Sequence, residues 1–112
     1  GMERIGVHWY SAEPFLEEVL SLPGLEVAGI FSHFASADED PDFTREQLAR
    51  FRSVLDGLER AGRRPPIAHI ANSAGLAAFP EARLDMVRPG IMLYGYEPGA
   101  LRETGVEPVM RL

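Results

Sequence analysis

The 112-residue sequence contains no cysteine and no lysine, since all eleven of its positively charged side chains are arginines. The lack of cysteine excludes disulfide bonds, thiolate metal ligands and cysteine nucleophiles, and it fits a reducing compartment. The lack of lysine means that a reaction that needs a side-chain amine, such as Schiff-base formation, cannot be completed by this chain alone.

Long apolar runs and clustered positive charge are also missing. No stretch approaches about eighteen consecutive apolar residues, and no basic region followed by an apolar stretch opens the chain. We therefore expect neither a membrane span nor a secretory signal, and we expect a cytoplasmic protein. The net charge of -6 argues against a nucleic acid or an anionic membrane as partner, because both need clustered positive charge. A small neutral or anionic metabolite remains compatible with the sequence.

The apolar content is sufficient for a folded core. Hydrophobic residues make up 46% of the chain and charged residues 25%, within the range of a single domain. Helical spacing of apolar residues predicts helices over 12–22, 44–61 and 73–78. Short apolar runs predict strands at 4–7, 25–31, 67–71, 86–88 and 109–112. We expect Ser11 and Asn72-Ser73 to act as helix N-caps.

The predicted elements alternate between strand and helix. Continuous apolar strands that alternate with helices indicate an α/β protein with a parallel sheet covered by helices. Four such units make either half of a (β/α)8 barrel or a small open sheet, and the pattern alone does not choose between them.

Residues 35–43 are acidic and contain a proline, which predicts an exposed loop. Four carboxylates lie in this loop, at Asp38, Glu39, Asp40 and Asp42. They lack the regular spacing and the central glycine of a calcium loop. We therefore interpret the segment as a solvated acidic loop and expect no metal site.

Polar side chains stand where the predicted strands end, which is where the functional residues of parallel α/β proteins lie. These candidates are Arg4, His33, the group of His69, Asn72 and Ser73, and Arg88. The first three candidates also have structural interpretations, as a surface ion pair, a histidine at the edge of the core and a helix cap. Arg88 is harder to explain in that way, because an unpaired buried guanidinium is costly and needs a specific partner.

Two of the predicted turns can bind one anion together. Ser73 follows the strand at 67–71, and Gly90 follows the strand at 86–88. Loops after neighbouring parallel strands can converge on one phosphate through hydroxyl and backbone N–H donors. The two turns together therefore favour phosphate binding more strongly than either turn does alone.

Five blocks of the sequence resemble the alanine racemase family in their order and spacing. They are GMERIG (1–6), GIFSHFA (29–35) with ADE (37–39), FTREQ (43–47), HIANSA (69–74) and DMVRPGIMLYG (85–95). The blocks extend over nearly the whole chain. The resemblance implies roughly the C-terminal half of a TIM (β/α)8 barrel, in an N-terminal domain that binds pyridoxal 5'-phosphate.

The resemblance also implies a set of cofactor contacts. The family residues that match Ser73, Gly90 and Ile91 hold the cofactor phosphate, and the asparagine that matches Asn72 lies beside them. The arginine that matches Arg4 hydrogen-bonds near the phenolic oxygen of the cofactor and helps hold the substrate carboxylate.

Two further matches concern the pyridine ring of the cofactor. In the family, the residue that matches Arg88 faces the pyridine nitrogen, and the histidine that matches His33 supports that arginine. A permanently charged guanidinium disfavours a second positive charge on the ring nitrogen. The ring is then a weaker electron sink, which limits side reactions of a carbanion.

The family's two catalytic bases have no match in this chain. Its lysine precedes the matched region, and its tyrosine belongs to a C-terminal β-domain contributed by a second subunit. We therefore expect no catalytic residue here and expect the chain to be inactive alone. Residues 1–100 are expected to form a partial barrel domain, and residues 101–112 to begin the crossing into the β-domain. The expected parent is a homodimer that supplies D-alanine for peptidoglycan.

Two alternatives remain open. One is a non-catalytic pyridoxal-phosphate-binding barrel protein, which a chain ending soon after the barrel would favour. The other is a related racemase that acts on serine, lysine or arginine, because side-chain selection depends mostly on residues outside this stretch.

Overall fold

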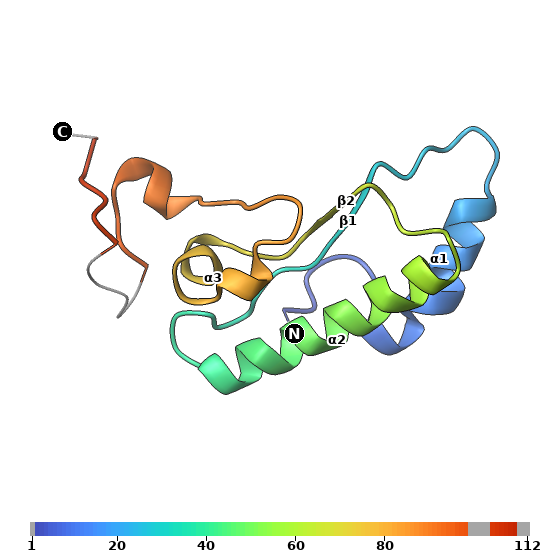
Figure 1. The fold of residues 1–112 in the computed structure, drawn as a ribbon, viewed down its shortest axis with the longest axis horizontal. Coiled ribbons are helices and arrows are strands. Elements are labelled where there is room, and N and C mark those ends of the chain that lie inside the picture. Colours follow the sequence, from blue (N-terminus) through green and yellow to red (C-terminus); the bar gives the residue numbers. More distant parts are fainter. Residues whose placement is uncertain (1, 99–103, 110–112) are drawn as a thin grey trace.

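The computed structural model describes residues 2–98 and 104–109 (Figure 1). Three α-helices are present in these residues: α1 (Ala12–Ser21), α2 (Pro41–Arg60) and α3 (Ser73–Ala78). Two strands, β1 (Gly29–Phe31) and β2 (Ile67–His69), and three short 3-10 helices, η1 (Trp9–Ser11), η2 (Pro80–Ala82) and η3 (Ile91–Tyr94), complete the set. Among these described helices, none has the length and apolar content needed to cross a membrane.

Strands β1 and β2 form a parallel pair, which confirms the predicted parallel β/α class. Gly29 lies opposite Ile67, and Phe31 lies opposite His69. A side chain at position 29 would place its Cβ 2.9 Å from the carbonyl oxygen of Ile67, so the close approach of the two strands requires glycine there. Because successive side chains of a strand point to opposite faces, the sheet has two distinct faces.

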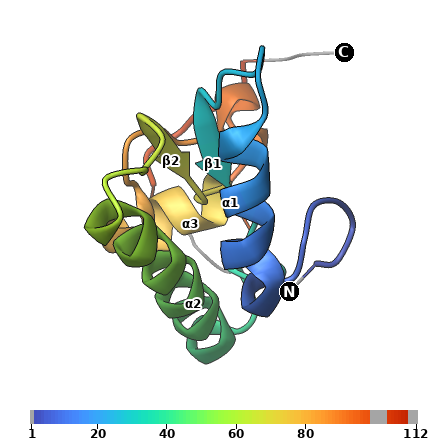
Figure 2. The same ribbon diagram turned by 90° about the vertical axis from the view of Figure 1, so that its right-hand side faces the viewer.

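Helices α1 and α2 lie side by side below one face of the sheet (Figure 2). Ile30 of β1 packs against the buried residues of both helices, and Ala68 of β2 is completely buried. The core residues contributed by α2 recur at helical spacing and are Leu48, Phe51, Leu55 and Leu58. The cross-strand neighbours Phe31 and His69 lie on the opposite face of the sheet, which α1 and α2 do not cover.

Helix α2 begins at Pro41, three residues before the predicted start at position 44. Proline is tolerated at the first helical position because its missing N–H would have no partner there. The Asp40 carboxylate accepts a hydrogen bond from the Phe43 backbone N–H at 2.9 Å, so it caps the helix. The predicted loop at 35–43 is therefore correct only as far as Asp40.

The Asp40 cap can be tested by substitution. We expect Asp40→Ala to lower the free energy of unfolding by about 1 kcal/mol, because it leaves a backbone N–H at the helix start without its acceptor. Urea denaturation followed by circular dichroism measures the change. Ser11→Ala is the matched control. Ser11 precedes α1, but its side chain makes no capping hydrogen bond, so the predicted cap at Ser11 is wrong. Equal losses for the two variants would contradict the assignment.

Several predicted strands are wrong. Residues 4–7 form a bend and extended coil, because Glu3 and Gly6 have φ angles of 54° and 83° that interrupt an extended backbone. The strand at 25–31 is limited to Gly29–Phe31 and is only partly buried, and the strand at 67–71 ends at His69. Val109 is in coil, and the rest of the predicted strand at 109–112 lies outside the described residues.

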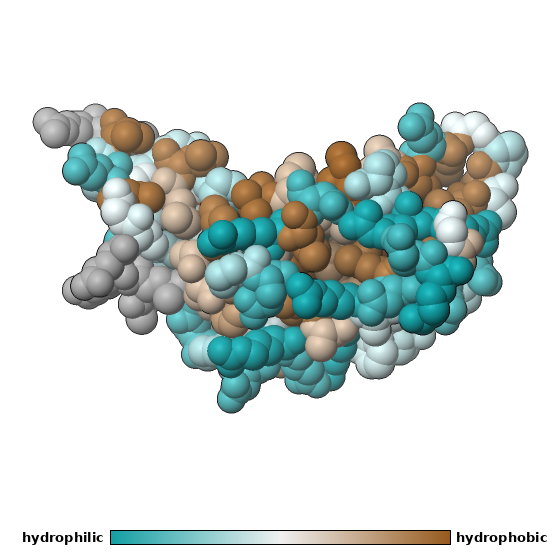
Figure 3. All heavy atoms as spheres, viewed as in Figure 1, coloured by the Kyte–Doolittle hydropathy of each residue, from teal (hydrophilic) through white to brown (hydrophobic). Residues whose placement is uncertain are grey.

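The segment 86–88 runs beside β2 without forming a strand. Two backbone hydrogen bonds connect it to that region, from Asp85 N to Ala68 O at 3.1 Å and from Arg88 N to Ala71 O at 3.0 Å. The next residue, Pro89, has no N–H to extend a ladder. Large apolar side chains are also left exposed on the described surface. Figure 3 shows hydrophobic, brown patches above the hydrophilic surface of α2.

Candidate functional site

Arg88 lies at the centre of a cluster of hydrogen bonds. Its Nη2 donates to the Ser32 carbonyl oxygen at 2.8 Å, to His33 Nδ1 at 3.2 Å and to the Ile70 carbonyl oxygen at 3.4 Å. Its Nη1 contacts His69 Nδ1. The half-buried guanidinium thus has the specific partners that a buried arginine needs.

The two histidines of this cluster are held in their neutral form. Burial lowers the pKa of His33 below its ordinary value of 6.5, and the positive charges of Arg88 and then Arg4 lower it further. Burial and then the charge of Arg88 lower the pKa of His69 in the same direction. An arginine can only donate hydrogen bonds, so each imidazole must present an unprotonated Nδ1 to Arg88. The cluster therefore carries its positive charge on the arginine.

The Ser73 hydroxyl lies against the turn at 90–92. Its oxygen accepts a hydrogen bond from the Met92 backbone N–H at 3.3 Å, and only 5% of the residue is exposed. Gly90 and Ile91 form the turn that enters η3. The predicted meeting of the Ser73 turn with this second turn is thus present, and the serine hydroxyl hydrogen remains available to donate to an anion.

Asn72 has a structural role in the described fold. Its side-chain oxygen accepts a hydrogen bond from the Gly75 backbone N–H at 2.9 Å and caps α3, which confirms the predicted cap and the predicted helix to Ala78. Its amide NH2 group is not used in that bond. A cofactor contact by Asn72 stays a prediction.

Arg4 is exposed on the irregular N-terminal segment rather than at a strand end. It is near enough to His33 to lower the pKa of that histidine. The structure therefore brings Arg88, His33 and His69 into contact and places Arg4 in their electrostatic surroundings. The direct contact between Arg88 and His69 was missed in the sequence, because His69 falls in the middle of the predicted strand at 67–71, whereas in the structure it ends β2.

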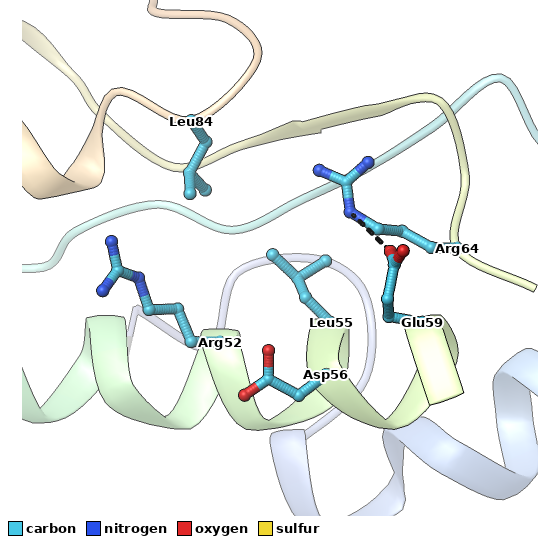
Figure 4. A pocket seen from close by; sticks show the side chains of 6 residues that line it. All are labelled: Arg52, Leu55, Asp56, Glu59, Arg64 and Leu84. Carbon is cyan, nitrogen blue, oxygen red and sulfur yellow. Dashed lines mark ion pairs between the residues drawn. The ribbon is translucent and has the colours of Figure 1, made fainter. Parts of the chain in front are cut away.

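A hollow of about 460 Å³ lies between α2 and the chain leading into β2 (Figure 4). It is lined by Arg52, Leu55, Asp56, Glu59, Arg64 and Leu84. Its charges are mixed: Arg64 forms a 3.7 Å ion pair with Glu59, and Arg52 donates to the Glu81 carbonyl oxygen at 2.6 Å. No group of three or more potential metal-ligating side chains occurs within residues 2–98 and 104–109.

Asp85 connects this region to β2 and makes stability depend on pH. Its carboxylate accepts hydrogen bonds from Ala68 N at 2.8 Å and from Arg64 Nη2 at 2.5 Å. These two bonds, the backbone one first, hold the pKa of Asp85 below its ordinary value of 3.8. A depressed carboxyl pKa stabilises the fold above the unfolded-state pKa, and this stabilisation is lost as the pH falls through the folded-state pKa.

We expect Asp85→Asn to lower the melting temperature by a constant amount between about pH 5 and 7, and by less as the pH falls below about 4. Thermal unfolding of both forms across this pH range measures the difference. Asp56→Asn, in the neighbouring hollow, is a control whose effect should be small. A difference between the Asp85 forms that grows toward low pH would refute the assignment.

Parallel β/α units with polar side chains gathered at the carboxyl ends of their strands define an α/β protein, and barrel enzymes place their active sites at this end of the strands. Comparisons with known proteins give the family. Residues 1–98 match the family described as the N-terminal domain of alanine racemase. The chain belongs to this family, and it is a parallel β/α segment of the TIM barrel that forms the family's N-terminal domain.

Individual relatives agree with this assignment. The alanine racemase of Halothermothrix orenii is 45% identical over 113 residues, which cover 98% of this chain and 30% of that protein. That of Carboxydothermus hydrogenoformans is 50% identical over 99 residues, covering 88% and 27%. A solved alanine racemase of Clostridium difficile in complex with cycloserine has a TM-score of 0.85 at 36% identity, covering 96% of this chain and 30% of that one. The chain spans about 30% of the length of such relatives.

Proposed function

We propose that the complete polypeptide carrying this chain is a pyridoxal-phosphate-dependent alanine racemase, which interconverts L-alanine and D-alanine. One observation carries the proposal beyond the family match. The guanidinium of Arg88 is held by two neutral histidines in one cluster, while Ser73 meets the turn at 90–92 in another. The Arg88 cluster suits the pyridine ring of the cofactor, and the contact between Ser73 and the turn suits its phosphate group.

The residues present fit the cofactor. The hydroxyl of Ser73 and the backbone N–H of Ile91 would hold the phosphate, because hydroxyl and amide donors at a turn favour an anion. The Gly90 N–H donates to the Arg88 carbonyl oxygen at 2.9 Å, so we propose that Gly90 contributes to the phosphate site by forming the turn. Asn72 lies next to Ser73 and has its NH2 group free of the capping bond. When bound, pyridoxal phosphate supplies an electron sink for a carbanion at the substrate α-carbon.

Arg88 would face the pyridine nitrogen and keep it unprotonated, because two positive charges in contact repel each other. His33 and His69 accept hydrogen bonds from the guanidinium and fix its orientation. Arg4 would hold the carboxylate of the amino acid, since its exposed guanidinium can donate two parallel hydrogen bonds to a carboxylate.

The residues that move protons belong to other parts of the parent polypeptide. This sequence has no lysine, and the tyrosine base is expected in a C-terminal β-domain of a second subunit. We assign residues 1–100 to the partial barrel and residues 101–112 to the crossing toward that domain. The parent would be a cytoplasmic homodimer that supplies D-alanine for peptidoglycan.

A racemisation assay tests the proposal. With added pyridoxal phosphate, the complete polypeptide should convert L-alanine to D-alanine, detected by chiral chromatography, whereas the 112-residue chain should show no turnover above background. Turnover by the isolated chain would refute the assignment of both bases to other segments.

The same assay separates the alternatives. Faster turnover of serine, lysine or arginine than of alanine would identify a related racemase. Stoichiometric cofactor binding by the complete polypeptide with no turnover of any amino acid would identify a non-catalytic binding protein.

A further inference from the structure

The ring of Phe31 lies against both partners at the centre of the candidate site. It stacks on the His69 imidazole with a centroid distance of 5.2 Å and an interplanar angle of 4°. The guanidinium carbon of Arg88 lies 5.5 Å from the centroid of the same ring. One aromatic side chain thus contacts the two groups that form the Arg88–His69 hydrogen bond.

The strand register accounts for this arrangement. Phe31 is the last residue of β1 and lies directly opposite His69, the last residue of β2. Side chains of directly opposed residues on one face of a sheet are close neighbours. The backbone bond from Ser32 N to His69 O, at 3.1 Å, continues the pairing past the strand end and fixes this register.

The exposure of Phe31 indicates that it is not a core residue of the described fold. The side chain is 54% exposed and belongs to neither buried cluster, whereas its neighbour Ile30 packs against both. An aromatic ring within about 6 Å of a guanidinium attracts it through the negative face of the ring. Because Phe31 stacks on the face of the His69 imidazole, the ring nitrogen of His69 can still accept a hydrogen bond in the plane of its ring.

We propose that Phe31 is a positioning residue: its ring is the platform on which the His69 imidazole and the Arg88 guanidinium are held side by side. The carbonyl partners alone do not fix which guanidinium N–H donates to each of them, because an arginine has five N–H donors. Contact with the Phe31 ring restricts Arg88 to fewer rotamers. The significance of this role for a cofactor rests on the proposed function. The geometry itself involves only residues of this chain.

Side-chain NMR on the complete polypeptide, before cofactor is added, tests the platform. We expect Phe31→Leu to lower the order parameter of the Arg88 side-chain N–H to below about 0.6, the range of flexible groups, because the ring contact is lost. Phe31→Tyr keeps the ring and should keep the order parameter. Phe15→Leu is the matched control, since Phe15 is a partly exposed phenylalanine on α1, outside the site. Phe31→Met, a second non-aromatic variant, should behave like Phe31→Leu.

Two results would overturn the platform: an unchanged order parameter in Phe31→Leu and Phe31→Met, or an equal loss in Phe31→Tyr. Cofactor affinity of the complete polypeptide gives a second readout. Phe31→Leu should weaken pyridoxal phosphate binding roughly two- to fivefold, and Phe31→Tyr should not. Failure of every form to bind the cofactor would reject the proposed function, while the NMR comparison would still decide the role of Phe31.

Discussion

Replacement of Arg88 by leucine is expected to lower the free energy of unfolding by about 2 kcal/mol. The substitution keeps an apolar stem but removes every donor that Arg88 supplies to Ser32, His33, His69 and Ile70. Hydrogen bonds that involve a charged group contribute about 1.5–3 kcal/mol, and half-burial of the site prevents water from replacing them fully. Urea denaturation followed by circular dichroism measures the loss.

Arg83→Leu is the matched control for this substitution. Arg83 is exposed and donates one hydrogen bond, of 3.3 Å, to the Leu76 carbonyl oxygen, so its loss should cost less than about 0.5 kcal/mol. Arg88→Lys should recover only part of the stability, because an ammonium group lacks the planar fork that reaches several acceptors at once. Equal stabilities of Arg88→Leu and Arg83→Leu would contradict the central place given to Arg88.

Replacement of Phe34 by alanine should have the largest effect on stability, about 3–5 kcal/mol. Phe34 is 1% exposed, and its ring packs 6.1 Å from that of Phe79. A Cβ at position 75 would lie 2.8 Å from the Phe34 ring, so Gly75 leaves the space that this ring fills. Removal of the ring leaves a cavity between α3 and the chain that follows β1.

The Phe34 prediction is measured by the shift in the urea midpoint. Phe15→Ala, on the exposed side of α1, is its control and should cost far less. Because Phe34 directly follows His33, its loss should also weaken the contact between His33 and Arg88. A midpoint in Phe34→Ala equal to that of Phe15→Ala would show that the described core is incorrect.

The helices could be predicted closely from the sequence, since their information is local. Apolar spacing predicted a helix over 12–22, and the structure has Ala12–Ser21. The short helix after Asn72 was predicted with its cap and its end. The start of α2 was missed because the cap and the proline at positions 40 and 41 were interpreted as parts of a loop.

The strands were predicted less well because a strand depends on a partner that local sequence does not show. The apolar run at 25–31 forms only three strand residues, limited by the length over which β2 lies beside it. The segment at 4–7 has the composition of a strand but the wrong backbone, because Glu3 and Gly6 have positive φ angles.

For the candidate site too, properties of single residues could be predicted from the sequence, whereas contacts between distant residues could not. Arg88 was identified as needing a partner, because the cost of an unpaired guanidinium is a property of the residue itself. The identity of its partners, apart from His33 through the family resemblance, depended on how β1 and β2 are aligned. Phe31 carried no signal in the sequence, since a phenylalanine in an apolar run predicts only burial.

The hydrogen bonds of Arg88 also have a consequence for the kinetics of folding. The guanidinium reaches Ser32 across 56 residues of chain and His33 across 55. Contacts between such distant residues form only after the intervening chain has closed into a loop. Loop closure lowers the conformational entropy of the chain before the contacts can offset that loss. The hydrogen bonds of Arg88 to Ser32 and His33 therefore cannot form within a local segment. We expect them to form late in folding, when the segments before and after α2 come together.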